Sequence, residues 1–407
     1  MSDVSWDMRL FDRQGNAINA NYSGYSDIGT TNQIAHATDR RLNFYLNAVD
    51  ECEFSLYLDD PMAQQIRRLT RFVKVWRTVP GYSDPSNQPA FTGIVGYHQK
   101  DGQGNIMRVK CFSPFWRLQF RFHLLNHYLK TNSSTGNDYK QSELIWKLID
   151  LINNAFGLSV SFTGISQGTF YDVANEVVIA PYFQPKGANT WVEIFDEILL
   201  RPGSVDLIPR YHHTAGNSTL MYLDTALKRG AERSTTFTYR TATPSNCINV
   251  VEEEFVSPGE FANYVWAVGA GGPNSGKVAV SQDNSALDEG YNAIGIYMRR
   301  VDKPDIKKVG ILNGPQGKPT DLRAISQAEL ERSIVPKLNY SVSLSPAANI
   351  YYGKDFSMGD VVNLTATKNA LNVNEQQRIY QCVLSISDNN METAAPLLAP
   401  DFYGKII

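Results

Sequence analysis

One glycine-rich segment has the spacing of a phosphate-binding loop. Residues 271–277, Gly-Gly-Pro-Asn-Ser-Gly-Lys, fit the pattern G-x-x-x-x-G-K. Such a loop also needs a Ser or Thr after the lysine to hold magnesium, and a helix whose N-terminus faces the phosphate. Val278 stands in the Ser/Thr position, and the residues from Lys277 to Val280 have a strand pattern. We therefore expect a glycine-rich hairpin here.

Two pairs of histidines could ligate a metal. His123 and His127 are one helical turn apart, as in zinc peptidases, but Leu124 follows His123, so the glutamate that would act as general base is missing. Position suggests no third ligand, and we expect interfacial or solvent-facing histidines. His212 and His213 lie in a polar stretch before Asn217, and we expect them at the surface.

The sequence contains few signs of nucleophilic or acid–base catalysis. There is no G-x-S-x-G motif, and no cysteine stands beside a histidine. Acidic residues gather in four places, and such groups are more often solvated faces, turns or caps than a glycosidase pair: Asp59-Asp60, Glu252 to Glu254, Asp283 and Asp288-Glu289. We predict no catalytic, cofactor-binding or metal-binding residues, no cofactor, and no enzymatic activity.

Basic and aromatic residues concentrate between residues 67 and 122, but the formal net charge is −3 and neither end has a basic tail. We interpret the basic residues as part of a charged exterior or of a subunit contact and not as a DNA-binding face. They are Arg67, Arg68, Arg71, Arg108, Lys110, Arg117 and Arg121. The aromatic residues are expected to pack on a neighbouring unit: Phe112, Phe115, Trp116, Phe120 and Phe122. No apolar run approaches the ~20 residues that cross a bilayer, so we expect no stable membrane insertion.

Four cysteines are spread widely along the chain, each in or beside an apparent strand: Cys52, Cys111, Cys247 and Cys382. The N-terminal residues include Asp3 and have no apolar core, so a secretory signal is not expected. We predict four free thiols in a protein made in a reducing cytosol.

The elements that would position these residues are mostly strands. The 407 residues are 43% hydrophobic with 21 Tyr and 19 Phe, a profile that favours many short strands and polar loops. Alternation predicts strands over residues 6–11, 52–58, 72–77, 91–96, 107–112, 205–210, 219–223, 235–239, 248–255, 264–269, 278–280, 340–344, 361–366 and 379–387. Helices are predicted over 62–69 after Pro61, over 142–156 with Ser142 as N-cap, over 189–200, and from Ser326 as a capping-box start.

The order of elements between Arg41 and Phe122 is strand, Asp-Pro helix, strand, Phe-x-Gly strand, glycine-rich turn and basic strand. This order resembles the first barrel of the tail-hub proteins of long-tailed, siphophage-type bacteriophages, also called baseplate hub or minor tail proteins. Four further segments resemble sequences that are usual in that family: 191–196, 248–251, 263–269 and 352–361.

The resemblance implies a mainly β fold with α+β insertions, built on two tail-tube-like antiparallel β-barrels and two smaller accessory domains. The implied division is 1–117 as the first barrel, 118–203 as an α/β accessory domain, 204–255 with 338–407 as the second barrel, and 256–337 as a β-rich accessory domain. No cell-wall hydrolase domain is expected after the last strand.

By the same resemblance the protein would be a structural virion component, synthesised in the host cytoplasm and located at the distal tail tip or baseplate. It would form a homotrimer that adapts six-fold tail rings to a three-fold tip. Its partners would be the distal tail protein ring, the tape measure protein and tip or central fibre proteins, with DNA passing through its channel only as cargo. A receptor- or carbohydrate-binding tail protein and, with less support, a cell-wall hydrolase are the alternatives.

Overall fold

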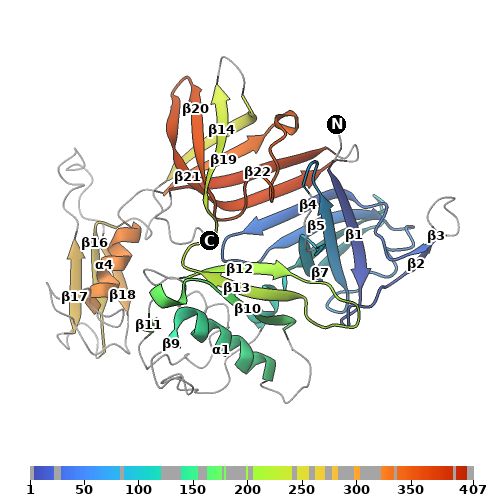
Figure 1. Ribbon diagram of the computed structural model, residues 1–407, viewed down its shortest axis with the longest axis horizontal. Coiled ribbons are helices and arrows are strands. Elements are labelled where there is room, and N and C mark those ends of the chain that lie inside the picture. The colour runs from blue at the N-terminus through green and yellow to red at the C-terminus, as the bar shows by residue number, and fades with distance from the viewer. Residues whose placement is uncertain are drawn as a thin grey trace.

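The computed structural model describes residues 4–22, 29–82, 87–120, 139–154, 163–176, 178–179, 199, 205–240, 245–255, 262–270, 277–282, 298–302, 322–333, 337–387 and 391–400. The predicted helix over 189–200 lies outside these residues except for Leu199. The described chain is mainly β, with one large sheet and several small ones (Figure 1).

Six strands from the first third of the chain form one part of the large sheet, which we call the N-terminal strand group. In spatial order they are β1 (Ser5–Phe11), β6 (Phe72–Thr78), β7 (Phe91–Asp101), β8 (Ile106–Phe112), β5 (Glu51–Tyr57) and β4 (Thr38–Tyr45). All neighbours in this group are antiparallel. In β5, Phe54 and Leu56 are buried and Tyr57 is exposed, so the predicted alternation is confirmed.

Six later strands form the rest of the sheet, which we call the C-terminal strand group: β14 (Glu232–Arg240), β15 (Cys247–Phe255), β19 (Lys337–Leu344), β20 (Val361–Lys368), β21 (Leu371–Ile386) and β22 (Glu392–Ala399). Their order is β14-β20-β21-β22-β19-β15, with only the β14–β20 pair parallel.

The two groups join through β4 and β21, which pair antiparallel with Leu42 opposite Leu384. The result is a single 12-stranded sheet. In Figure 1 the blue strands of the first group lie beside the orange and red strands of the second. One cluster of buried apolar side chains includes residues from both groups, so their cores are continuous.

The outer edges of both groups make further hydrogen bonds, although no strand pairing among the described residues closes either group. Along β1, Leu10 donates its N–H to the Asn32 carbonyl at 2.9 Å, and Ile34 donates to the Met8 carbonyl at 2.8 Å. At the other end of the sheet, the Asn246 amide N–H donates to the Thr238 carbonyl of β14 at 3.1 Å. The Asn246 side chain accepts from the Thr238 N–H and donates to the Thr236 carbonyl, each at 2.7 Å.

Two smaller units accompany the large sheet. The first contains helix α1 (Gln141–Asn154), a three-stranded sheet of β10 (Ile165–Phe170), β13 (Met221–Ala226) and β12 (Asp206–Tyr211), and the pair β9 (Tyr139–Lys140) with β11 (Val178–Ile179). The second contains β17 (Val278–Gln282), β16 (Tyr264–Val268) and β18 (Met298–Asp302), with α4 (Leu322–Ser333) on one face, and it stands apart from the large sheet in Figure 1.

Short elements complete the described chain. They are the hairpin of β2 (Ala20–Tyr22) with β3 (Gly29–Thr31) and the 3-10 helices η1 (Pro114–Phe120), η2 (Val173–Asn175) and η5 (Pro346–Ala348). None of the helices within the described residues is long and apolar enough to span a bilayer.

The predicted helix over 62–69 is wrong. These residues form turns, although Asp60 does accept a capping hydrogen bond from the Met62 N–H at 2.7 Å. The Leu69 N–H donates to the Val95 carbonyl of β7 at 2.8 Å instead of to a helical carbonyl. A contact with the sheet therefore replaces the helical hydrogen bond.

The predicted caps Ser142 and Ser326 are also wrong, because both serines lie inside their helices. The Glu176 carboxylate, distant in sequence, accepts from the Ser142 N–H at 2.9 Å and from its hydroxyl at 2.6 Å. A carboxylate at this position satisfies helix donors and complements the positive helix end. The Ser326 hydroxyl donates to the Arg323 carbonyl at 3.0 Å.

The apolar face of α1 is buried as predicted, with Leu144, Leu148 and Ile152 in the core. We expect Leu148→Ala to lower the free energy of unfolding by about 2–5 kcal/mol, because it removes a fully buried side chain and leaves a cavity. Urea denaturation measures this change. Leu151→Ala, at a partly exposed position on the same helix, is the matched control and should lower the free energy of unfolding by less. If both variants lower it by the same small amount, the face that contains Leu148 is not buried.

Candidate functional site

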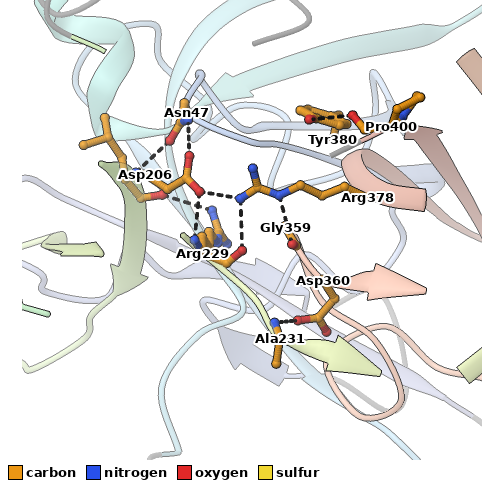
Figure 2. A network of polar contacts seen from close by, with 10 residues as sticks. Asn47, Asp206, Arg229, Ala231, Gly359, Asp360, Arg378, Tyr380 and Pro400 are labelled. Carbon is orange, nitrogen blue, oxygen red and sulfur yellow. Dashed lines mark hydrogen bonds and ion pairs between the residues drawn. The ribbon is translucent and has the colours of Figure 1, made fainter. Parts of the chain in front are cut away.

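A buried arginine of the large sheet joins four segments of the chain (Figure 2). Arg378 of β21 donates from Nη2 to the Asp206 carboxylate of β12 and, at 3.1 Å, to the Arg229 carbonyl. Its Nε donates to the Gly359 carbonyl at 3.1 Å. Both charged side chains are almost excluded from water. The ion pair therefore links the large sheet to the three-stranded sheet.

The Asp206 carboxylate has two further donors. The Asn47 side-chain amide donates to Oδ1 at 2.7 Å, and the Arg229 N–H donates to Oδ2 at 2.8 Å. Asn47 also accepts from the Leu207 N–H at 2.7 Å, so the β4–β5 turn is bonded to β12 twice. Hydrogen bonds to a charged acceptor such as this carboxylate are stronger than those between neutral groups.

Next to this ion pair, residues 229–231 and 359–360 meet at backbone distance. Gly230 and Gly359 have φ angles of 90° and 81°, and a Cβ added to either would lie 2.3 Å from the other turn's backbone. Asp360 closes the contact by accepting from the Ala231 N–H at 2.7 Å and from Arg233 Nε at 2.8 Å. We call the whole set around Arg378, Asp206 and Asp360 the arginine junction.

The groups of the arginine junction have a structural role. Its members are two carboxylates, arginines, an amide and backbone groups, and each carboxylate is already bonded to several donors. Among the described residues no group of three or more His, Cys, Asp or Glu side chains could hold a metal ion. The junction holds the sheets together.

A third buried carboxylate lies close by, at the end of the β4–β5 turn. Asp50 accepts from the Tyr211 hydroxyl of β12 and, at 2.8 Å, from the Tyr45 N–H. Its own N–H donates to the Ser113 hydroxyl at 3.1 Å. Burial raises the pKa of Asp50 from 3.8 to about 6, against the opposing effect of these donors.

This raised pKa predicts a pH-dependent contribution to stability. The folded chain holds the Asp50 proton more tightly than the unfolded chain, so the contribution is complete below about pH 4 and is lost as the pH rises through about 6. Over that window we expect wild type to lose up to about 3 kcal/mol relative to Asp50→Asn. Urea denaturation at several pH values tests this, with Asp59→Asn as the exposed control. Parallel stability curves for wild type and Asp50→Asn would contradict it.

A second buried charge pair crosses between the two strand groups. Arg77 of β6 bonds both carboxylate oxygens of Glu392 of β22, at 2.6 and 2.5 Å, and donates to the Tyr352 carbonyl at 2.6 Å. The Trp6 indole N–H donates to the same carboxylate at 2.8 Å. A bidentate arginine–carboxylate pair of this kind fixes orientation as well as distance.

The predicted glycine-rich hairpin agrees with the residues that are described. β16 and β17 pair antiparallel, and the Gly269 N–H donates to the Lys277 carbonyl at 2.8 Å. A strand follows Lys277, so the helix that a phosphate-binding loop needs is not there. Residues 271–276, like His123, His127, Asp283, Asp288 and Glu289, lie outside the described part of the chain.

His212 and His213 are half-buried, which corrects the expectation of surface histidines. Lys74 of β6 is fully buried and donates from Nζ to the His212 carbonyl at 3.1 Å, and it bonds His213 Nδ1 at 3.0 Å. The His213 ring packs against Phe11 and Trp76. Burial lowers the pKa of Lys74 to about 8, and burial with the lysine charge lowers the pKa of His213 to about 4. These groups attach the β12–β13 hairpin to β6.

Sequence reasoning missed one histidine–carboxylate pair. His36 Nδ1 lies 2.9 Å from Asp60 Oδ2, and the Tyr22 hydroxyl donates to Asp60 Oδ1 at 3.0 Å. Asp59 is exposed while Asp60 is buried, so the two adjacent aspartates do not form a catalytic pair. The Asp-Pro turn at 60–61 was the available signal, but His36 is 24 residues away in sequence.

The basic residues do not form a continuous positive face among the described residues. Lys110 lies 2.9 Å from Glu51 and 3.1 Å from Glu53, and Arg117 donates to the Thr163 carbonyl at 3.1 Å. Arg67, Arg68 and Arg108 are exposed. Of the aromatic group, Phe112 and Trp116 stack at 4.7 Å and Phe115 is buried, so they pack within the fold. Arg121 and Phe122 lie outside the described residues, as does the side chain of Phe120.

The four cysteines are buried and free, as predicted. Cys52 and Cys111 stand opposite each other on β5 and β8. Burial raises the pKa of each thiol above its ordinary value, which keeps the groups protonated and unreactive.

Known proteins match this chain by structure and not by sequence. No family model and no curated protein matches it. The tail protein of Neisseria meningitidis MC58 superposes with a TM-score of 0.59 at 11% identity, over 98% of this chain and 97% of that one. This chain has the fold of a tail protein. The 43 kDa tail protein of prophage MuSo2 from Shewanella oneidensis gives 0.55 at 13% identity, over 98% and 100%. Prophage tail protein gp18 of Listeria monocytogenes EGD-e gives 0.50 at 12%, over 98% and 94%.

The expected resemblance to tail proteins is therefore confirmed at the level of the fold. The hub assignment and the domain boundaries stay predictions.

Proposed function

We propose that this protein is a structural component of a phage virion, the trimeric hub at the distal tip of a siphophage-type tail. The observation that carries the proposal is the agreement of fold with tail proteins along 98% of this chain and at least 94% of theirs. Agreement over whole chains, rather than over one sheet, favours a shared architecture and a shared kind of role.

The proposed architecture has two tail-tube-like barrels, one from each strand group. Two sets of hydrogen bonds support it. The segment 32–34 bonds the outer edge of β1 and leads into β4, the opposite edge of its group. Asn246, at the start of β15, bonds β14, the opposite edge of the other group. Each strand group would thereby close into a barrel, in which the edge strands are protected.

Three such chains would present six barrels in a ring and thus adapt a six-fold tail ring above to a three-fold tip below. The proposed partners are the distal tail protein ring, the tape measure protein and tip or central fibre proteins. DNA would pass through the channel as cargo, and the location would be the distal tail tip of the virion. The proposed division remains 1–117 and 204–255 with 338–407 as barrels, and 118–203 and 256–337 as accessory domains.

We propose no catalytic role. The buried carboxylates and lysine and the half-buried histidine that could do chemistry are engaged in contacts between segments: Asp50, Asp60, Asp206, Asp360, Lys74 and His213.

The purified full chain tests the proposal. We expect light scattering to give the mass of three chains and negative-stain images to show a three-fold ring. A monomer that binds a glycan array would instead support the receptor- or carbohydrate-binding alternative. Loss of turbidity of a cell-wall suspension would support the hydrolase.

A further inference from the structure

A short basic loop on the N-terminal strand group exposes an apolar side chain. Arg67, Arg68 and Leu69 are all exposed, and Leu69 exposes 58% of its surface. Within the described residues neither guanidinium forms a hydrogen bond or an ion pair. The Leu69 N–H bonds the Val95 carbonyl at 2.8 Å, which holds the loop on β7. We call residues 67–69 the basic loop.

The outer edge of β15, on the C-terminal strand group, has the opposite charge. Ile248 and Val251 expose 60% and 49% of their surfaces, and Glu253 beside them is exposed and unpaired within the described residues. Among the described residues β15 pairs with β19, and Asn246 at its start bonds β14. Exposed apolar side chains that lie close together mark a surface that another chain can cover. We call Ile248, Val251 and Glu253 the β15 edge patch.

We propose that these two surfaces bind each other between neighbouring copies, with the basic loop of one protomer on the β15 edge patch of the next. A closed ring uses two different surfaces of the same chain, so each copy must present both halves of the contact. This chain has both halves. The basic loop on the N-terminal strand group combines an apolar side chain with positive charge, and the β15 edge patch on the C-terminal strand group combines apolar side chains with negative charge. This inference rests on the proposed trimer and names its interface.

A second copy fits the basic loop better than DNA does. Phosphates would satisfy the two arginines, but an exposed leucine adds nothing to phosphate binding. The leucine instead fits the apolar surface of Ile248 and Val251, and complementary charges at the rim of such a contact set its register and favour association.

Charge reversal tests the interface. We expect Arg67→Glu with Arg68→Glu to weaken trimer association by roughly tenfold or more, since it replaces attraction by repulsion at the rim. Glu253→Lys alone should also weaken it, and adding Glu253→Lys to the double variant should recover part of the loss. Ile248→Ser tests the apolar centre independently of charge. Sedimentation velocity over a concentration series gives the dissociation constants.

Two reversals of equal charge serve as controls. Lys100→Glu on β7 and Glu232→Lys on β14 alter exposed residues outside both surfaces and should leave association unchanged. Circular dichroism and melting confirm that each variant folds. If wild type forms a trimer and the basic-loop, Glu253 and Ile248 variants all keep its affinity, the interface is overturned while the hub proposal stands. A wild-type chain that stays monomeric at every concentration overturns the proposed trimer and this interface together.

Discussion

A chain stopped at Lys337 is expected to be insoluble. The deletion removes almost all of β19 and the whole of β20, β21 and β22. β4 then loses its partner β21, β14 loses β20, and β15 loses β19. Unpaired edges of this kind pair with other chains and aggregate. The deletion also uncovers the apolar core that Leu42 shares with Leu384.

The measurement is the soluble fraction after expression, followed by a thermal melt of whatever remains soluble. A chain stopped at Pro400 keeps every strand of the large sheet and is the matched control. If residues 1–337 are soluble, melt cooperatively and still form a ring, the two-barrel architecture is wrong and the hub proposal loses its structural support.

Arg378→Met is expected to lower the free energy of unfolding by about 3–5 kcal/mol, the range for removing one partner of a buried ion pair. The substitution leaves the Asp206 carboxylate buried without its cation. It also leaves the Gly359 and Arg229 carbonyls without a donor. The penalty comes from these unpaired groups rather than from lost packing, because methionine keeps much of the side-chain volume.

The double variant Arg378→Met with Asp206→Asn separates this explanation from simple misfolding. Because it leaves neither charge unpaired, its loss should be smaller than the sum of the two single losses. Arg300→Met is the control, since Arg300 pairs with Asp302 where both side chains are more than half exposed, and it should change stability by less than about 1 kcal/mol. Additive losses in the double variant would refute the buried pair as the cause.

Patterns over short stretches of sequence predicted the elements well. Alternation located β5 and the apolar spacing located α1, because a residue's side of a strand or helix is a local property. The antiparallel hairpin after Gly269 followed from Val278 in place of a Ser or Thr. The four free thiols followed from their positions in strands.

Local patterns failed where a distant segment competes for the same backbone groups. Residues 62–69 form turns and not a helix, and the Leu69 N–H bonds the Val95 carbonyl of β7. Ser142 is not a cap because Glu176, 34 residues away, caps α1. His212 and His213 are half-buried and not fully exposed because the buried Lys74 of β6 bonds the His212 carbonyl and the His213 ring.

The sequence by itself determined that this protein is built mainly of strands and that its order of elements resembles a tail protein. It located many of the strands but not β4, β10 or β22. Tertiary structure alone decided that β4 pairs with β21, that Arg378 meets Asp206 across 172 residues, and that Arg77 meets Glu392 across 315. The reason is physical. The spacing of apolar residues along a short stretch of sequence shows which face of a strand or helix is buried. A buried charge, in contrast, can be paired by any distant segment that the fold brings within reach.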